Sequence, residues 1–252
     1  MGKGAKVRWG EYVYCAHERG CYRLISHFCQ ENGCATIDDA SLVSPNASRL
    51  YKKYMERLNA SAMTVVSIAN QSVEEIENRP KDTVGACAID AAGNISSGVS
   101  SGGIWLKHPG RVGPASAYGC GCWAETRKDA DAGVAVSTTG RGEQLVKTLF
   151  AKELSEAALN SNNLTLAVSK TFNDKFLNSR FLARDLTKQG GALVLYFKEG
   201  VGELTWAHTT SSMCVGYLRV KDDSKPVSVI SRLPEKSTEG CALHMQGISF
   251  KP

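Results

Sequence analysis

The sequence predicts an α+β fold in which two packed sheets are covered by helices. Short apolar strands open the region that begins at residue 83, two amphipathic helices follow, and further strands close the chain. A doubly wound fold would alternate strands with helices throughout, so this order argues against it. With 252 residues, of which 42% are hydrophobic and 22% charged, the chain can bury a substantial core.

Residues 1–82 form the first expected region. Helices are predicted over residues 21–32 and 48–58, and the second carries Leu50 and Tyr54 at four-residue spacing. Residues 67–82 are polar and acidic, which is typical of a flexible approach to a cleavage point. We therefore expect residues 1–82 and 83–252 to be separate parts of the protein.

Residues 83–252 hold most of the predicted regular structure. A hairpin is expected first, with strands over residues 83–90 and 95–100 around a glycine-containing turn. The other predicted elements are, in chain order, a strand at 133–137, a helix at 143–159 with Val146, Phe150 and Leu154 in one stripe, a helix at 164–176 with Val168, Phe172 and Phe176 in another, strands at 191–197, 203–209 and 213–220, a turn at 200–202, and an edge strand at 225–230.

Composition excludes several classes of function. The net charge of +5 is mild and spread along the chain, so neither nucleic acid nor a membrane is an expected partner. The first residues are polar and no apolar run approaches the length of a membrane span, which predicts a cytoplasmic or nuclear protein. Nine cysteines are an odd number, and reduced thiols are expected there. Cys120-Gly121-Cys122 lacks zinc-pair spacing, so we predict no metal site and no cofactor.

The dipeptide Asp82-Thr83 carries the strongest chemical signal. A threonine at the start of a buried strand, preceded by an acidic residue, suits a hydrolase whose nucleophile is an N-terminal threonine. Cleavage of the Asp82–Thr83 bond would give Thr83 a free amine with a reference pKa of about 7.7–8.0. That amine can accept the hydroxyl proton near neutral pH, so no histidine base is required.

Three further segments fit the same chemistry. Ser101 ends the strand that is expected to pair with that of Thr83, where the two hydroxyls could touch. Arg111 lies in a glycine-proline loop suited to a bidentate grip on a carboxylate. Thr139 and Gly140, where a strand gives way to a helix, offer a hydroxyl and backbone N–H groups for an oxyanion hole.

Long motifs in this order resemble the type 2 asparaginase family of N-terminal-nucleophile (Ntn) hydrolases. They are Asp-Thr-Val-Gly-Ala from Asp82, Gly-Arg-Val-Gly around Arg111, and Thr-Gly-x-Gly-Glu from Thr139. Within the family, the threonine aspartase branch is the nearest likeness, through residues 107–113, 118–125, 208–217 and 230–234. The resemblance implies an αββα four-layer sandwich. It also implies self-cleavage between Asp82 and Thr83 into an α/β heterodimer, and dimers of such heterodimers.

The resemblance also implies roles for individual residues. Thr83 is the nucleophile, supported by the hydroxyl of Ser101, while Thr139 and Gly140 bind the oxyanion and substrate. Arg111 holds the substrate carboxylate, and Lys107 and Gly142 are expected beside it. Each residue also has a purely structural alternative: close packing for Ser101, an ion pair for Arg111, and a helix N-cap for Thr139 and Gly140. His208, on an apolar strand, is expected to be a core histidine, and Cys120 and Cys122 are expected to be packing residues.

The expected function is that of a threonine endopeptidase that cleaves protein substrates after aspartate. Asparaginases place an aspartate three residues after the arginine to hold the substrate amine, and Pro114 stands there instead. Losing that contact favours a peptide chain over free asparagine. The alternatives are an asparaginase or isoaspartyl dipeptidase, or an inactive chain that acts only as an interaction partner.

One departure from the family pattern concerns the start of the chain. Family members begin with a His-Ala-Gly-Ala-Gly or His-Gly-Gly-Ala-Gly strand, followed by helices and an Asn-Ala-Gly-x-Gly loop, and these motifs are absent here. The resemblance therefore predicts an incomplete sandwich that lacks the N-terminal strands and helices, with exposed sheet edges.

Overall fold

The computed structural model describes residues 31, 33, 43–61, 83–90, 92–101, 111–127, 131–219 and 225–251. The chain divides into two compact units. One comprises residues 1–82 and 103–111, and the other comprises residues 83–102 and 112–252. Asp82, Lys107 and all of the predicted helix at 21–32 except residue 31 lie outside the described residues.

The described helix of the smaller unit is α2, Pro45–Ser61. It extends the helix predicted at 48–58 by three residues at each end. The hydroxyl of Ser44 accepts the backbone N–H of Ala47 at 3.1 Å, and Pro45 follows at the first helical position. Serine and proline are favoured at these two places, which explains the earlier start.

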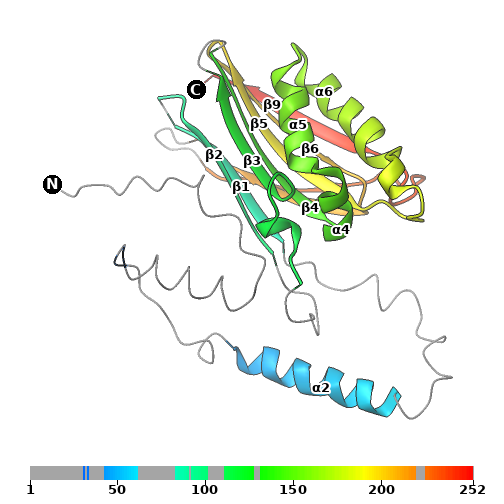
Figure 1. Ribbon diagram of the computed structural model, residues 1–252. Coiled ribbons are helices and arrows are strands. Elements are labelled where there is room, and N and C mark those ends of the chain that lie inside the picture. The colour runs from blue at the N-terminus through cyan, green and yellow to red at the C-terminus, as the bar shows by residue number, and fades with distance from the viewer. Residues whose placement is uncertain are drawn as a thin grey trace. The chain divides into compact units, whose positions relative to one another are not determined.

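The larger unit is built on an antiparallel sheet of five strands (Figure 1). The order across this central sheet is β3-β4-β5-β6-β9, with β3 Cys122–Arg127, β4 Ala132–Gly140, β5 Gly190–Lys198, β6 Val201–His208 and β9 His244–Phe250. The strands predicted at 133–137, 191–197 and 203–209 are confirmed as β4, β5 and β6. The strands β3 and β9 were not predicted from the sequence.

Helices cover one face of the central sheet, as Figure 1 shows. The helix predicted at 143–159 is two helices, α4 Gly142–Thr148 and α5 Phe150–Leu159. Leu149 between them has a left-handed backbone, with φ of 48°. The break lets the N–H of Lys152, in the first turn of α5, donate to the Gly119 carbonyl at 2.9 Å. It also rotates the two halves, so Val146 is exposed while Leu145 is buried.

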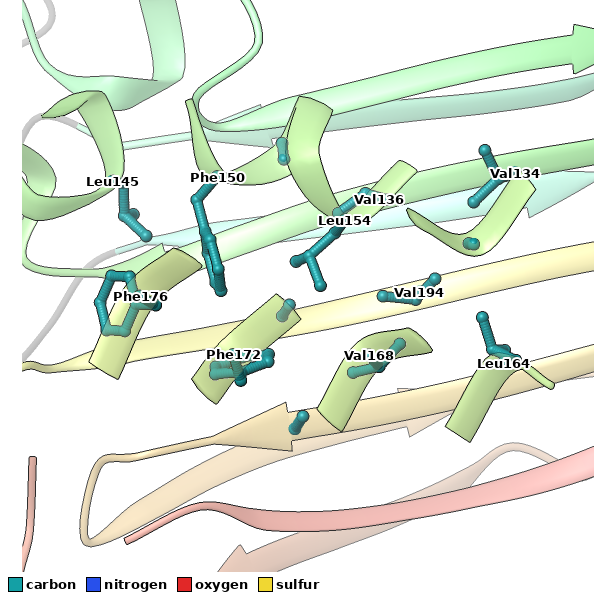
Figure 2. Close-up of a cluster of buried hydrophobic side chains, with 14 of the residues drawn as sticks. Val134, Val136, Leu145, Phe150, Leu154, Leu164, Val168, Phe172, Phe176 and Val194 are labelled. Atoms are coloured by element: carbon teal, nitrogen blue, oxygen red, sulfur yellow. The ribbon is translucent and has the colours of Figure 1, made fainter. Parts of the chain in front are cut away.

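The second predicted helix, at 164–176, is α6 Leu164–Thr171 continued by the π-helix η5 Phe172–Leu177. The side chain of Asn163 caps α6 by accepting the N–H of Leu166 at 2.8 Å. In Figure 2, Phe172 and Phe176 point toward Phe150 of α5. Their ring centroids lie 4.8 Å and 4.7 Å from that of Phe150. These three fully buried rings form the centre of the core between helices and sheet.

The opposite face of the central sheet packs against two separate hairpins. They are β1–β2, Val84–Ile89 with Ile95–Ser100, and β7–β8, Ser212–Tyr217 with Val227–Arg232. The edge strand predicted at 225–230 corresponds to β8, which pairs with β7 in this two-stranded hairpin. Alternation along β4 divides the two cores, because Val134 and Val136 face the helices while Ala135 faces the hairpins.

The larger unit therefore has three layers of described elements: helices, the central sheet and the pair of hairpins. This arrangement confirms the predicted α+β class, in which sheets pack face to face under helices. Within the described residues, no helix is both long and apolar enough to span a membrane.

Candidate active site

The structure brings Thr83 and Ser101 together at the open end of the β1–β2 hairpin. Thr83 directly precedes β1, Ser101 directly follows β2, and the register pairs Val84 with Ser100. The Oγ1 of Thr83 and the Oγ of Ser101 lie 2.9 Å apart, which is hydrogen-bonding distance. Both residues are half-buried. The threonine hydroxyl is therefore oriented by its neighbour, in a residue that stays partly exposed.

A glycine seats this hairpin closely on the central sheet. A Cβ placed on Gly85 would lie 1.9 Å from the Oγ of Ser137 in β4, so only glycine fits there. At the other end of the hairpin, Ile95 lies against Gly133. The strand β1 therefore runs antiparallel to β4 in the layer beneath. This direction brings the Thr83 end of β1 to the Thr139 end of β4.

Thr139 and Gly140 are the last two residues of β4 and both are half-buried. Gly140 has φ of 136°, and a Cβ there would lie 2.3 Å from the carbonyl oxygen of Gln189. Both facts require glycine. Arg141 is the N-cap of α4, and Gly142 is its first residue. The predicted strand-to-helix switch is present, although Thr139 and Gly140 belong to the strand and not to the cap.

His208 is a buried structural residue, as the sequence predicted, and is fully excluded from solvent. Its Nδ1 lies 2.8 Å from the carbonyl oxygen of Thr210, which can only accept, so Nδ1 carries the proton. The Nε2 then accepts the hydroxyl of Ser231 at 2.9 Å. Burial lowers the pKa of His208, and nearby His244 lowers it further. Both ring nitrogens are occupied, so this imidazole is not available as a base.

The described cysteines are free thiols, and two of them lie between the hairpin and the sheet. The Sγ of Cys87 contacts the carbonyl of Leu193 at 3.8 Å. Burial, with a further contribution from Cys122, raises the pKa of the Cys87 thiol to about 12. A thiol that stays protonated at neutral pH is a packing group. In the part of the chain that the structure describes, no group of three His, Cys, Asp or Glu side chains is placed to hold a metal ion.

The predicted substrate ligands are only partly described. Arg111 is half-buried and belongs to the smaller unit, whereas Thr83 belongs to the larger one. Lys107 and Asp82 lie outside the described residues. Pro114 is buried at the start of the short helix η3, Pro114–Ser116. The substrate-binding roles of Arg111 and Lys107 therefore stay predictions.

Two features of the site were not found by sequence reasoning. The contact between Gly85 and Ser137 had a signal, because glycine inside a strand often marks a close approach of backbones. The second is Gln144, whose side chain is 1% exposed and hydrogen-bonded to the segment that precedes β5. Nothing in the sequence distinguishes that residue from a surface glutamine on an amphipathic helix.

Comparison with known proteins gives one consistent family. Residues 24–227 match the family described as Asparaginase. An isoaspartyl peptidase of Salmonella typhimurium is 36% identical over 125 residues, which is 50% of this chain and 38% of that protein. A plant-type L-asparaginase of Pyrobaculum calidifontis is 34% identical over 134 residues, covering 52% and 42%. An isoaspartyl peptidase/L-asparaginase of Danio rerio is 30% identical over 151 residues, covering 58% and 43%. The chain spans about two fifths of the length of these curated relatives.

Proposed function

This chain belongs to the asparaginase family of Ntn hydrolases, and we propose that it hydrolyses amide bonds of aspartyl or asparaginyl units with Thr83 as the nucleophile. The observation that carries the proposal is the 2.9 Å contact between the hydroxyls of Thr83 and Ser101. A hydrogen bond from a second hydroxyl at this distance orients the attacking oxygen, while the freed α-amine accepts its proton.

The reaction would begin with cleavage of the Asp82–Thr83 bond. The Oγ1 of Thr83 attacks the carbonyl of Asp82, and an N→O acyl shift gives an ester that water hydrolyses. The freed α-amine of Thr83 then serves as the base for each later turnover. In those turnovers Oγ1 attacks the substrate carbonyl, the amine passes the proton to the leaving group, and water releases the acyl group. The two resulting chains would stay together as an α/β heterodimer.

The remaining predicted residues would bind the substrate and its oxyanion. Thr139 and Gly140 lie at the end of β4 nearest the start of β1, so a hydroxyl and a backbone N–H would be available to the attacked carbonyl. Arg111, Lys107 and Gly142 would bind the substrate, with the guanidinium of Arg111 pairing with its carboxylate. Self-cleavage, the oxyanion role and these contacts are parts of one proposal.

The names of the relatives favour a small substrate. Each reported relative is called an isoaspartyl peptidase, an L-asparaginase or both. On that ground asparagine or an isoaspartyl dipeptide is the first candidate. Such a substrate needs a partner for its free amine as well as for its carboxylate.

Pro114 favours a second candidate, a protein substrate cut after aspartate, as in the threonine aspartases that parts of the sequence resemble. Proline has no side-chain acceptor, and this one is buried at the start of η3. It cannot bind an ammonium group as a carboxylate would. A peptide chain has no free amine at that point, so its binding would not be weakened by proline in place of aspartate.

Intact-mass measurement of the purified chain tests the nucleophile. We expect two fragments, the second beginning at Thr83, for the wild-type protein and for Thr83→Ser, which keeps a hydroxyl. Thr83→Val should stay whole. Cleavage of Thr83→Val at the same bond would contradict the mechanism, and an uncut wild-type chain would favour an inactive interaction partner.

A substrate panel then separates the two candidates. Ammonia released from asparagine, or aspartate from an isoaspartyl dipeptide, would support the first. Cleavage of peptides after internal aspartate, without turnover of either small substrate, would support the second. Turnover of none of them by the cleaved protein would refute both assignments.

A further inference from the structure

Gln144 links helix α4 to the segment that precedes β5 through its buried side-chain amide. Its Nε2 donates to the carbonyl of Thr187 at 2.8 Å, and its Oε1 accepts the N–H of Gln189 at 2.8 Å. The side-chain amide thus donates to one backbone carbonyl and accepts from one backbone N–H, as the backbone of a residue in a neighbouring antiparallel strand would, although it projects from helix α4. At 1% exposure it makes them out of contact with water.

These bonds resolve a conflict that the strand-to-helix switch creates at Arg141. The ladder pairs Gly140 with Gly190, so Arg141 stands opposite Gln189. One ladder bond is made there, from the N–H of Arg141 to the carbonyl of Gln189 at 2.8 Å. The reciprocal bond is missing, because the carbonyl of Arg141 accepts the N–H groups of Gln144 and Leu145, at 3.0 Å and 3.1 Å, to begin α4.

The N–H of Gln189 would therefore have lost its ladder partner, which is costly for a backbone donor away from water. The Oε1 of Gln144 replaces that partner. The chain can then leave the sheet at Arg141 while the backbone of Gln189 stays in place. The carbonyl of Gln189 in turn packs on Gly140, at the position where a Cβ would come within 2.3 Å.

We infer that Gln144 is a positioning residue that sets the backbone of Thr139 and Gly140 through the segment 187–189. This inference rests on the proposed function only for its catalytic consequence, since Thr139 and Gly140 are the proposed oxyanion and substrate pair. The amide of Gln144 bonds to Gln189, and Gln189 bonds to Arg141 and packs on Gly140. The backbone of Gly140 would then be held where the proposed oxyanion role needs it.

The hydroxyl of Thr209 supports this segment from its opposite side. The hydroxyl of Thr209 contacts the carbonyl of Lys188 and accepts the N–H of Gly190, at 2.5 Å and 2.9 Å. Successive residues of an extended segment direct their polar groups to alternate sides. Thr209 therefore cannot replace the bonds of Gln144. Of these two side chains, only Gln144 supports the side of the segment that faces Gly140.

Hydrogen exchange and kinetics on the full chain test the inference with three variants. Gln144→Leu removes both bonds, and Gln144→Glu keeps an acceptor but needs a proton to donate to the Thr187 carbonyl. Thr148→Val is the control, because Thr148 is buried on the same helix and bonds only to carbonyls of α4, those of Gln144 and Leu145.

We expect Gln144→Leu to lose exchange protection over residues 139–142 and 187–190, and to lower kcat by about 10- to 100-fold, since small misplacements of reacting groups cost that much. Thr148→Val should do neither. For Gln144→Glu, the ratio of its kcat to the wild-type kcat should rise as the pH falls, because the protonated carboxyl restores the second bond. A merely structural role would leave that ratio flat.

Unchanged protection over residues 139–142 in Gln144→Leu, or a flat ratio for Gln144→Glu, would overturn the inference. If Gln144→Leu does not fold, Gln144→Glu compared at low and high pH decides alone. A wild-type chain that neither cleaves itself nor turns over any substrate refutes the proposed function. The exchange data then still decide whether Gln144 governs the backbone at Gly140.

Discussion

The hydroxyls of Thr83 and Ser101 meet at 2.9 Å, although 17 residues and a complete hairpin separate them in the chain. We expect Ser101→Ala to slow both self-cleavage and turnover by about five- to tenfold, because one side-chain hydrogen bond contributes about 1 kcal/mol. Ser101→Thr, which keeps the hydroxyl, is the control. Time courses followed by denaturing gel measure the first effect, and wild-type rates in Ser101→Ala would refute the contact's role.

Gly85 should tolerate no side chain. In Gly85→Ala the new Cβ would collide with the Oγ of Ser137, and we expect the free energy of unfolding to fall by about 1–3 kcal/mol, as overpacking typically costs. Denaturant titration measures this change. Gly98→Ala, in the paired strand, has open space around its Cβ and should cost much less.

A double variant checks that explanation of the Gly85 effect. Ser137→Gly removes the colliding atoms, so Gly85→Ala should be less harmful in that background than in the wild type. Equal losses in both backgrounds would mean that the close approach of β1 to β4 is not the cause.

Protonation of His208 should make stability depend on pH. Burial lowers the pKa of His208 in the folded state below its ordinary value of 6.5. The unfolded chain then binds more protons than the folded one at pH values between these two pKa values. The free energy of unfolding should therefore be fully retained above pH 6.5 and fall as the pH drops through this window.

Denaturant titrations between pH 5 and 8 measure that dependence. His208→Gln should flatten it, because the titrating group is gone. His244→Gln is the control and should leave most of the slope, since burial is the larger cause of the shift at His208 and is unchanged. An equally steep slope in His208→Gln would assign the effect to other groups.

Cys87 should resist thiol reagents in the folded protein. Its pKa of about 12 leaves almost no thiolate at pH 8, and the side chain lies between two layers. Cys214 and Cys241 are exposed and should be alkylated rapidly. Peptide mapping by mass spectrometry after iodoacetamide treatment, with and without denaturant, makes this comparison. Rapid labelling of Cys87 in the native protein would show that the β1–β2 hairpin detaches from the sheet.

Hydrophobic periodicity predicts well those helices and strands that have one or both faces fully covered by neighbouring elements. Strand β4 reads as a continuous apolar run because helices cover one face and hairpins cover the other. The strands β3 and β9 escaped prediction because they flank the sheet and carry polar residues such as Glu125 and Gln246 on partly exposed faces. Alternation of so few residues is a weak signal.

The helix break at Leu149 shows a different limit. Nothing local disfavours a helix there, since leucine is a strong helix former. At the break, the N–H of Lys152 is satisfied by the Gly119 carbonyl, which lies in a turn some thirty residues earlier in the chain. The burial of Gln144 likewise involves hydrogen bonds to a distant segment, from its side chain to Thr187 and Gln189. By contrast, the contact between Thr83 and Ser101 could be predicted from the sequence, because the two residues stand at the open end of one predicted hairpin.

Every strand of the larger unit begins after Thr83, from β1 to β9. Processing at the preceding bond would therefore sever no described ladder, and both hydrophobic clusters would remain on a single polypeptide. Cleavage would then remove no strand from the larger unit, whose sheet and hairpins lie entirely after the cut bond. The new N-terminus at Thr83 would form next to Ser101, its hydrogen-bond partner, and the described sheets would not need to rearrange.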